Sequence, residues 1–112
     1  MPKKYTSNEC TIDFAFQRIG GKHKGRILWH LHNHTVLRYG ELRRLVTGIT
    51  AKMLTQTLRE LEEDQLIVKK TYYEVPPKVE YRLTVSGSEF IPFIRHLNQW
   101  GEMQMHRLQV QV

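Results

Sequence analysis

Residues 50–64 constrain the fold of this chain most, because at helical spacing they separate into an apolar face and a polar face. Three leucines recur at i, i+4 and i+7 and therefore share one stripe: Leu54, Leu58 and Leu61. The opposite side presents a cation, a hydroxyl, an amide and a guanidinium: Lys52, Thr55, Gln56 and Arg59. Thr50 precedes the helix, where its hydroxyl can accept one backbone N–H and leave other N-terminal donors for a phosphate. The segment predicts either a helix that reads DNA or an ordinary amphipathic surface helix.

The flanking segments favour the first interpretation. Upstream, residues 39–46 predict a short helix on Leu42, Leu45 and Val46, and Gly48 suits the turn that ends it. Downstream, residues 66–73 and 79–83 are rich in β-branched, aromatic and leucine residues and predict two strands. Residues 74–78 contain Pro76 and Pro77, which lack an N–H and cannot continue a ladder. A helix-turn-helix followed by a basic hairpin is the winged-helix arrangement.

Two further helices are expected before this unit. Residues 10–19 place Ile12, Phe16 and Ile19 at helical spacing, and the glycines at 20 and 21 should end that helix. Residues 22–32 predict the first core helix, with one apolar side: Ile27, Leu28 and Leu31. Its polar side is expected to carry Lys22, His23 and Arg26.

A long helix is expected from residue 84 to about residue 107, capped either by Thr84 or by the capping-box spacing of Ser86 and Glu89. Its apolar residues cover a wider arc than one small domain needs: Phe90, Ile91, Phe93, Ile94, Leu97, Trp100, Met103 and Met105. An exposed apolar surface of that size predicts a homodimer in which this helix, together with the helix of Ile12 and Phe16, packs against its twofold mate. The alternative is a helix covered entirely within its own chain.

The chain has 112 residues with 40% hydrophobic composition, which suits one domain and is too little for two. We expect an N-terminal arm and helix over residues 1–21, a DNA-binding core and wing over 22–83, and a dimerisation helix over 84–112. No run of 18 apolar residues occurs, and the first ten residues lack the apolar centre of a signal peptide, so a cytoplasmic protein that does not enter the membrane is expected. The single cysteine excludes an intrachain disulfide.

The charge is concentrated in one half of the chain. Residues 1–59 hold eleven Lys/Arg against three Asp/Glu, a net of +8, whereas residues 60–112 hold six against eight, a net of −2. A basic N-terminal half fits a surface that neutralises phosphates, since bound Lys and Arg release counterions from DNA. A basic face can equally bind RNA or anionic lipid, or simply keep the protein solvated.

At this point the sequence resembles a known family. The motifs that carry the resemblance are Gly20-Gly21-Lys22, Tyr39-x-Glu41-Leu42-Arg43-Arg44, Ile49-Thr50-x-Lys52-Met53-Leu54-Thr55-x-x-Leu58-Arg59-Glu60-Leu61-Glu62, Glu74-Val75-Pro76-Pro77-Lys78-Val79-Glu80-Tyr81 and Leu83-Thr84-x-x-Gly87. They look like the successive motifs of the HxlR-type winged-helix transcriptional regulators over about residues 10–101. Two positions depart from the pattern: members often have Cys-Pro where this chain has Cys10-Thr11, and Trp where it has His23.

The resemblance implies a fold that is mainly α with a small β-hairpin, a winged helix-turn-helix with added N- and C-terminal dimerisation helices. It implies a cytoplasmic, homodimeric regulator of double-stranded DNA, with the recognition helix in the major groove and the wing near the minor groove. The base-reading residues carried over are Lys52, Thr55, Gln56 and Arg59. Backbone contacts fall to Arg43, Thr50 and Lys78, and the dimer interface to Ile12, Phe16, Phe93, Leu97 and Trp100.

In some relatives a cysteine near the N-terminus detects oxidants, quinones or aldehydes, and Cys10 is similar in position. Thiol chemistry at Cys10 makes an oxidant or another small electrophile the expected class of effector. The alternative is a free cysteine with no signalling role.

Other chemistry has little support in the sequence. His30 and His34 are one turn apart, a spacing that can hold Zn²⁺ or Ni²⁺ with a third ligand, but no third ligand is identifiable, so no metal and no cofactor is predicted. No glycine-rich phosphate loop and no G-x-S-x-G elbow occurs, and the run Glu62-Glu63-Asp64 is typical of a solvated helix end, so no enzyme is predicted. A winged-helix protein-interaction module and an RNA-binding winged helix are the alternatives to the DNA-binding regulator.

Overall fold

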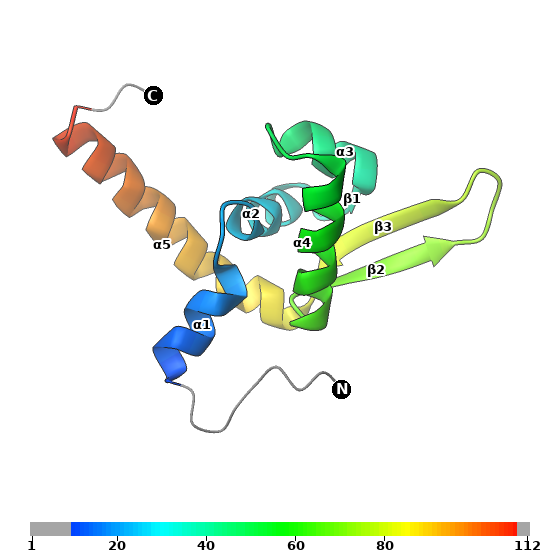
Figure 1. Cartoon of the computed structure of the whole chain (residues 1–112), viewed down its shortest axis with the longest axis horizontal. Helices are drawn as coiled ribbons and strands as arrows, with labels where there is room; N and C mark the ends of the chain where they lie inside the picture. The colour runs from blue at the N-terminus through cyan, green and yellow to red at the C-terminus, as the bar shows by residue number, and fades with distance from the viewer. Residues whose placement is uncertain (1–9, 110–112) are drawn as a thin grey trace.

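The computed structural model describes residues 10–109, so the expected N-terminal arm over residues 1–9 lies outside the described part of the chain. Figure 1 shows a helical body from which the hairpin of a small sheet projects, and the predicted elements occur in the expected order. The elements are α1 (Thr11–Ile19), α2 (Lys24–His34), β1 (Leu37–Arg38), α3 (Tyr39–Leu45), α4 (Ala51–Glu63), β2 (Ile67–Tyr72), β3 (Lys78–Leu83) and α5 (Val85–Arg107).

The sheet has three antiparallel strands in the order β1-β3-β2. β2 and β3 form the predicted hairpin, with Ile67 opposite Leu83 and Tyr72 opposite Lys78, and residues 73–77 as its tip. The sequence did not predict β1, because two residues are too few to show a period of two. Leu37 and Arg38 pair with Tyr81 and Glu80, which fixes the start of α3 to the base of the hairpin.

The core lies where α2, α4 and the start of α5 meet the sheet. The predicted stripes of α2 and α4 are confirmed, since each of these side chains is buried: Ile27, Leu28 and Leu31 of α2, and Leu54, Leu58 and Leu61 of α4. Leu42 of α3 and Ile91 and Ile94 of α5 are buried beside them. Fully burying one such side chain contributes roughly 1.5–3 kcal/mol, so the three leucines hold α4 firmly while its other side stays in solvent.

The turn between α3 and α4 follows the predicted pattern. Gly48 has a φ of 86°, a left-handed conformation that costs glycine little. The Arg26 guanidinium donates from Nη2 to the carbonyl oxygen of Thr47 at 2.9 Å and contacts its hydroxyl at 3.1 Å. These bonds join α2 to the turn and so fix the angle at which the chain enters α4.

His23 corrects one expectation. The imidazole is buried and does not lie on a polar helix face, because α2 begins at Lys24 and the residue before it does not follow helical periodicity. Its Nδ1 lies 3.3 Å from Nη1 of Arg26, and since arginine can only donate, Nδ1 accepts and Nε2 carries the hydrogen. Burial first, then Arg26 and Lys22, lowers the pKa of His23 below its ordinary value of 6.5.

Of the two predicted caps of α5, the structure uses Thr84. Its Oγ1 accepts from the backbone N–H of Gly87 at 3.0 Å and donates to the carbonyl of Gln65 at 2.6 Å. Gly87 is buried, and a Cβ placed on it would overlap the carbonyl oxygen of Leu66. The first turn of α5 is therefore packed directly on the backbone that leads into β2.

The wing and the terminal helices lie at opposite ends of the molecule, as Figure 1 shows. The radius of gyration of 15.5 Å exceeds the roughly 13 Å expected for a compact chain of this length, because both ends project. Among the described residues, no helix combines the length and the apolar character that crossing a bilayer requires.

The close contact at Gly87 leads to a prediction about the free energy of unfolding. Gly87→Ala should lower the free energy of unfolding by about 1–3 kcal/mol, because the new methyl overlaps a carbonyl that cannot move independently. Gly101→Ala in the same helix is the control: its Cβ meets nothing within 4 Å, so alanine should raise stability by about 0.5–1 kcal/mol. Chemical denaturation measures both, and equal effects would exclude the proposed overlap.

Candidate nucleic-acid interface

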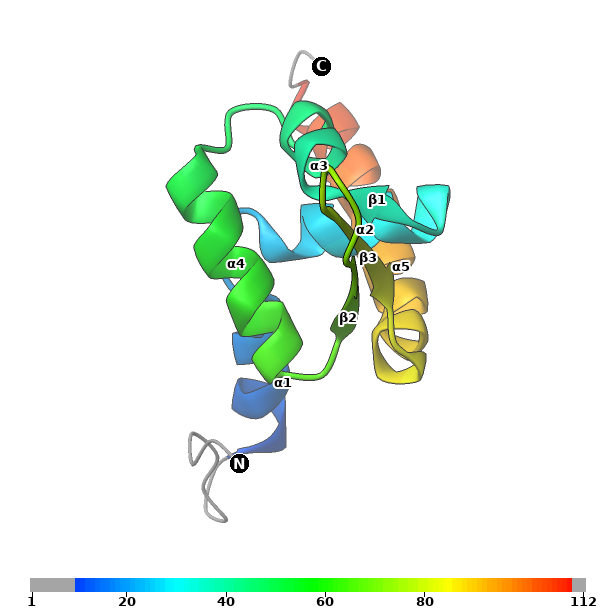
Figure 2. The ribbon, with the colours of Figure 1, turned by 90° about the vertical axis from the view of Figure 1, so that its right-hand side faces the viewer.

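The polar face of α4 points away from the core. Lys52, Thr55, Gln56 and Arg59 are all exposed, whereas Leu54, Leu58 and Leu61 on the opposite side are buried. Figure 2 shows α4 running along one side of the molecule, with the hairpin next to it and α3 at its upper end. A helix that is anchored on one face and open on the other can enter a groove without exposing its core.

The N-terminus of α4 is capped as predicted. Thr50 Oγ1 accepts from the backbone N–H of Met53 at 3.1 Å, which satisfies one of the unbonded donors of the first turn. Within the helix, the Thr57 hydroxyl donates to the carbonyl of Met53 at 2.6 Å. The remaining N–H groups of the first turn are the ones that could meet an anion.

Thr55 has a partner that the sequence did not reveal. The Tyr39 hydroxyl donates to the carbonyl of Ala51 at 2.9 Å and lies 3.1 Å from Oγ1 of Thr55. Since Tyr39 has one hydroxyl hydrogen, Thr55 must donate to Tyr39 in this arrangement. Thr55 therefore offers an outside partner its lone pairs and its methyl group.

Gln56 and Arg59 lie together on the outermost part of α4. Nε2 of Gln56 donates to Oε2 of Glu60 at 2.9 Å, and Nη1 of Arg59 lies 3.5 Å from Oε1 of Gln56. The amide is thus held by a carboxylate on one side and approached by a guanidinium on the other.

A groove runs between α4 and the sheet. It is lined by Tyr39, Thr55, Leu58, Arg59, Glu62, Glu63, Lys69 and Tyr81. Burial, followed by the charge of Glu62 and by Tyr39, raises the pKa of Tyr81 above its ordinary value of 10.0, so this phenol keeps its proton. The sequence did not predict Lys69 as a site residue, because its place in the groove with Arg59 follows from the packing of β2 against α4.

The wing carries more positive charge than Lys78 alone. The ammonium groups of Lys70 and Lys78 lie 4.9 Å and 4.4 Å from the centre of the Tyr72 ring, as cation–π contacts. Lys78 also lies 3.8 Å from Glu80, so the predicted wing contact is partly engaged within the hairpin. Lys69 and Lys70 are more exposed than Lys78, and Tyr73 and Val75 at the tip are almost fully in solvent.

α3 adds a basic edge next to the N-terminal end of α4. Arg43 is exposed, as expected of a backbone contact, and Arg38 and Arg44 line a shallow hollow next to it. Glu41 lines the same hollow and caps α3: its Oε1 accepts from the backbone N–H of Arg38 at 2.8 Å.

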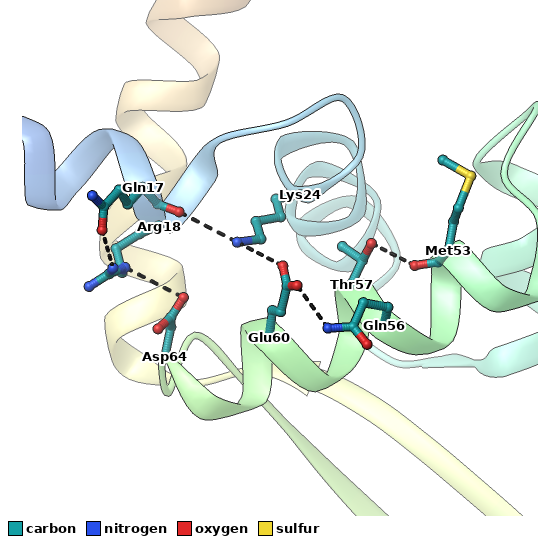
Figure 3. A network of polar contacts seen from close by, with 8 residues as sticks. All are labelled: Gln17, Arg18, Lys24, Met53, Gln56, Thr57, Glu60 and Asp64. Atoms are coloured by element: carbon teal, nitrogen blue, oxygen red, sulfur yellow. Dashed lines mark hydrogen bonds and ion pairs between the residues drawn. The ribbon is translucent and has the colours of Figure 1, made fainter. Parts of the chain in front are cut away.

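The C-terminal end of α4 corrects another expectation. The Asp64 side chain is only 1% exposed and lies 3.5 Å from Nε of Arg18, so it is not part of a solvated helix end. Arg18 is buried too, with its guanidinium 4.1 Å from the ring centre of Phe14. Figure 3 shows this ion pair joining α1 to the end of α4. Helical periodicity cannot predict it, because the two residues are far apart in the sequence.

The residues assigned to the dimer interface are exposed within this chain. Phe16 is 66% exposed and Trp100 54%, and the others are similarly open: Ile12, Phe93 and Leu97. On α5, Phe93, Leu97 and Trp100 recur at i, i+4 and i+7, and Ile91 and Ile94 form the separate stripe that the core uses. The alternative in which α5 is covered by its own chain is wrong for the described residues.

Cys10 is exposed and stands immediately before α1, where its carbonyl accepts from the N–H of Phe14 at 2.9 Å.

The side chains of His30 and His34 lie near each other, with ring centres 6.3 Å apart. Burial first, and then His34 and Arg26, lowers the pKa of His30 below its ordinary value of 6.5. Within residues 10–109, no three His, Cys, Asp or Glu side chains come together as metal ligands would.

Comparison with known proteins identifies the class. The family model described as HxlR-like helix-turn-helix matches residues 18–109. The chain belongs to this family. The HTH-type transcriptional regulator YdeP of Bacillus subtilis is 43% identical over 107 residues, which cover 93% of this chain and 83% of YdeP.

Solved structures agree with this assignment. The redox regulator HypR in its reduced form is 38% identical with a TM-score of 0.84, covering 91% of this chain and 100% of that one. Reduced YodB, a transcriptional regulator of B. subtilis, is 27% identical with a TM-score of 0.73, covering 84% and 92%. The predicted family, winged-helix fold and transcription-regulator class are confirmed, and since such regulators are not enzymes, so is the non-enzymatic class.

Proposed function

We propose that this HxlR-type protein binds double-stranded DNA as a homodimer, with one α4 helix in the major groove of each half of a palindromic operator. The observation that carries the proposal is the exposed polar face of α4, which stands between a basic α3 and a basic wing. Lys52, Gln56 and Arg59 offer base edges a cation, an amide and a guanidinium, and Thr55 offers an acceptor and a methyl group.

Backbone contacts are assigned to the residues around that face. Arg43 on α3 and Lys78 on the wing would neutralise phosphates on either side of the groove, and the capped first turn at Thr50 would present N–H groups to a third phosphate. Lys69 joins this set because it is exposed on β2 and lines the groove next to Arg59.

Substitutions on α4 test the base-reading role. Arg59→Ala should lower affinity for the operator by about 1–3 kcal/mol and reduce specificity, because a bidentate contact to a base is lost. Gln56→Ala should relax the base preference at one position of each half-site. Selection of bound sequences from random DNA and titration of the selected operator measure both effects.

Arg107→Ala is the matched control, since it removes an exposed arginine from the opposite end of the molecule. The selected sequence should show two half-sites about one helical turn apart, or a multiple of that spacing, and binding should weaken steeply with salt. Identical selected sequences for wild type, Gln56→Ala and Arg59→Ala would reject the assignment. Tighter binding to RNA than to duplex DNA would favour the RNA-binding alternative.

The homodimer is proposed on the second apolar stripe of α5 together with α1. Its side chains are Ile12, Phe16, Phe93, Leu97 and Trp100, and all are exposed in the single chain. An aliphatic and aromatic surface of this kind is a normal dimer interface and a liability in a monomer.

Charge placed in that stripe should separate the subunits. Trp100→Glu should raise the dimer dissociation constant at least about tenfold, because buried aromatic side chains dominate interface energies. Gln99→Glu adds the same charge to the neighbouring exposed position of α5 and should change the constant little. Sedimentation velocity across a concentration series reads out the oligomeric state, and a wild-type protein that stays monomeric at high concentration would refute the interface.

Cys10 is proposed as the site at which an oxidant changes DNA binding. Its thiol is exposed at the start of α1, two residues before Ile12 of the proposed interface, and the similar HypR structures are those of a redox regulator in reduced and oxidised forms. Because each chain has one cysteine, a disulfide between Cys10 side chains must join two chains.

Diamide tests this role, since it oxidises two thiols to one disulfide and is itself reduced to the hydrazine. Wild-type protein should release operator DNA on diamide treatment and recover with dithiothreitol, as followed by fluorescence anisotropy of labelled operator. Cys10→Ser should stay bound throughout. Equal release from both proteins would remove Cys10 from the mechanism.

A further inference from the structure

A polar chain joins the outer face of α4 to α2 and α1, as Figure 3 shows. Gln56 Nε2 donates to Glu60 Oε2 at 2.9 Å, and the other carboxylate oxygen of Glu60 lies 3.1 Å from Nζ of Lys24. Lys24 Nζ also lies 3.4 Å from the carbonyl oxygen of Gln17, in the last turn of α1. Each oxygen of Glu60 therefore has a different partner, one on the DNA-facing side and one on the body of the protein.

This series of polar contacts fixes which way the Gln56 amide points. With Nε2 directed at a carboxylate and Oε1 toward the Arg59 guanidinium, the orientation is electrostatically favourable, and the flipped amide would face like partners on both sides. One N–H of Nε2 is used by Glu60 and Oε1 accepts from Arg59, so the second N–H and one lone pair of Oε1 remain. A donor beside an acceptor is the pairing surface that adenine matches with N7 and its amino group.

Lys24 is placed to keep Glu60 in this position. Its side chain is 13% exposed against 36% for Glu60, so the ion pair leads from the edge of the exposed face of α4 toward the body of the protein. Without Lys24, the Glu60 carboxylate would lose a close cation that offsets its charge next to a polyanion, and its position relative to Gln56 would be less fixed. Long side chains also lose less entropy on binding when they are already held.

We propose that Glu60 is a positioning residue that orients Gln56 toward adenine, and that Lys24 holds Glu60 in place from α2. The proposal deepens the base-reading role of Gln56 and rests on the proposed function. It adds one specificity-determining residue on α4 and one on α2, and neither of these side chains contacts a base.

The first test is Lys24→Met. Selection from random DNA followed by titration of operators changed at the Gln56 position should show about a two- to tenfold loss of preference for adenine there, with other positions unchanged. Lys22→Met removes the same charge from an exposed neighbour and controls for weaker general attraction to DNA. Lys24→Arg keeps a cationic donor and should retain the preference.

The second test reaches the same position from the other side. Glu60→Ala should cause a similar loss, and Glu89→Ala on α5 controls for the removal of one negative charge. In a Gln56→Ala background, Lys24→Met and Glu60→Ala should have no further effect on base preference. That non-additivity distinguishes positioning from general destabilisation, which thermal melts of each variant follow independently.

The outcomes separate this inference from the proposed function. If Gln56→Ala relaxes base preference while Lys24→Met behaves like Lys22→Met and Glu60→Ala like Glu89→Ala, the positioning role is refuted and the base-reading role stands. If Gln56→Ala itself leaves base preference unchanged, both are refuted. A preference for guanine or cytosine at the Gln56 position would overturn the orientation assigned to the amide.

Discussion

The burial of three leucines on one side of α4 is the interaction on which the rest of this structure depends. Leu54, Leu58 and Leu61 are within the core, and their spacing leaves the polar side of the helix no place except solvent. The other elements adjust to that helix: Arg26 fixes the turn before it, and Tyr39 reaches its first turn through Ala51 and Thr55. The proposed reading face is thus a direct result of how the core is packed.

A second constraint acts at the other end of α4. The Arg18–Asp64 ion pair and the Lys24–Glu60 ion pair connect it to α1 and α2, so the helix is held at both ends and along one flank. Taking charges out of water is costly, and a buried pair needs close geometry to repay that cost. The proposed function gives these contacts a setting, because α1 bears Ile12 and Phe16 of the proposed subunit interface and follows directly after Cys10.

The sequence was enough to predict most of the fold and one face of the site. Positions that follow from local periodicity were predicted correctly: the α4 leucines are buried, Gln56 and Arg59 are exposed, and the hairpin turns around Pro76. Positions that follow from tertiary contacts were not predicted. His23 and Asp64 are buried, and Tyr39 and Lys69 reach α4 from other elements. A period of 3.6 residues describes one helix, and it contains no information on what packs against that helix.

The close contact between Gly87 and the carbonyl of Leu66 has a mechanical consequence. With no side chain between them and with the Thr84 hydroxyl bridging Gln65 to the first turn of α5, the base of the hairpin and the start of that helix form a stiff joint. In a dimer assembled on α5, a change in the crossing angle of the paired helices would move both hairpins together with them. The distance between the two hairpins would then change with the relative rotation of the two subunits.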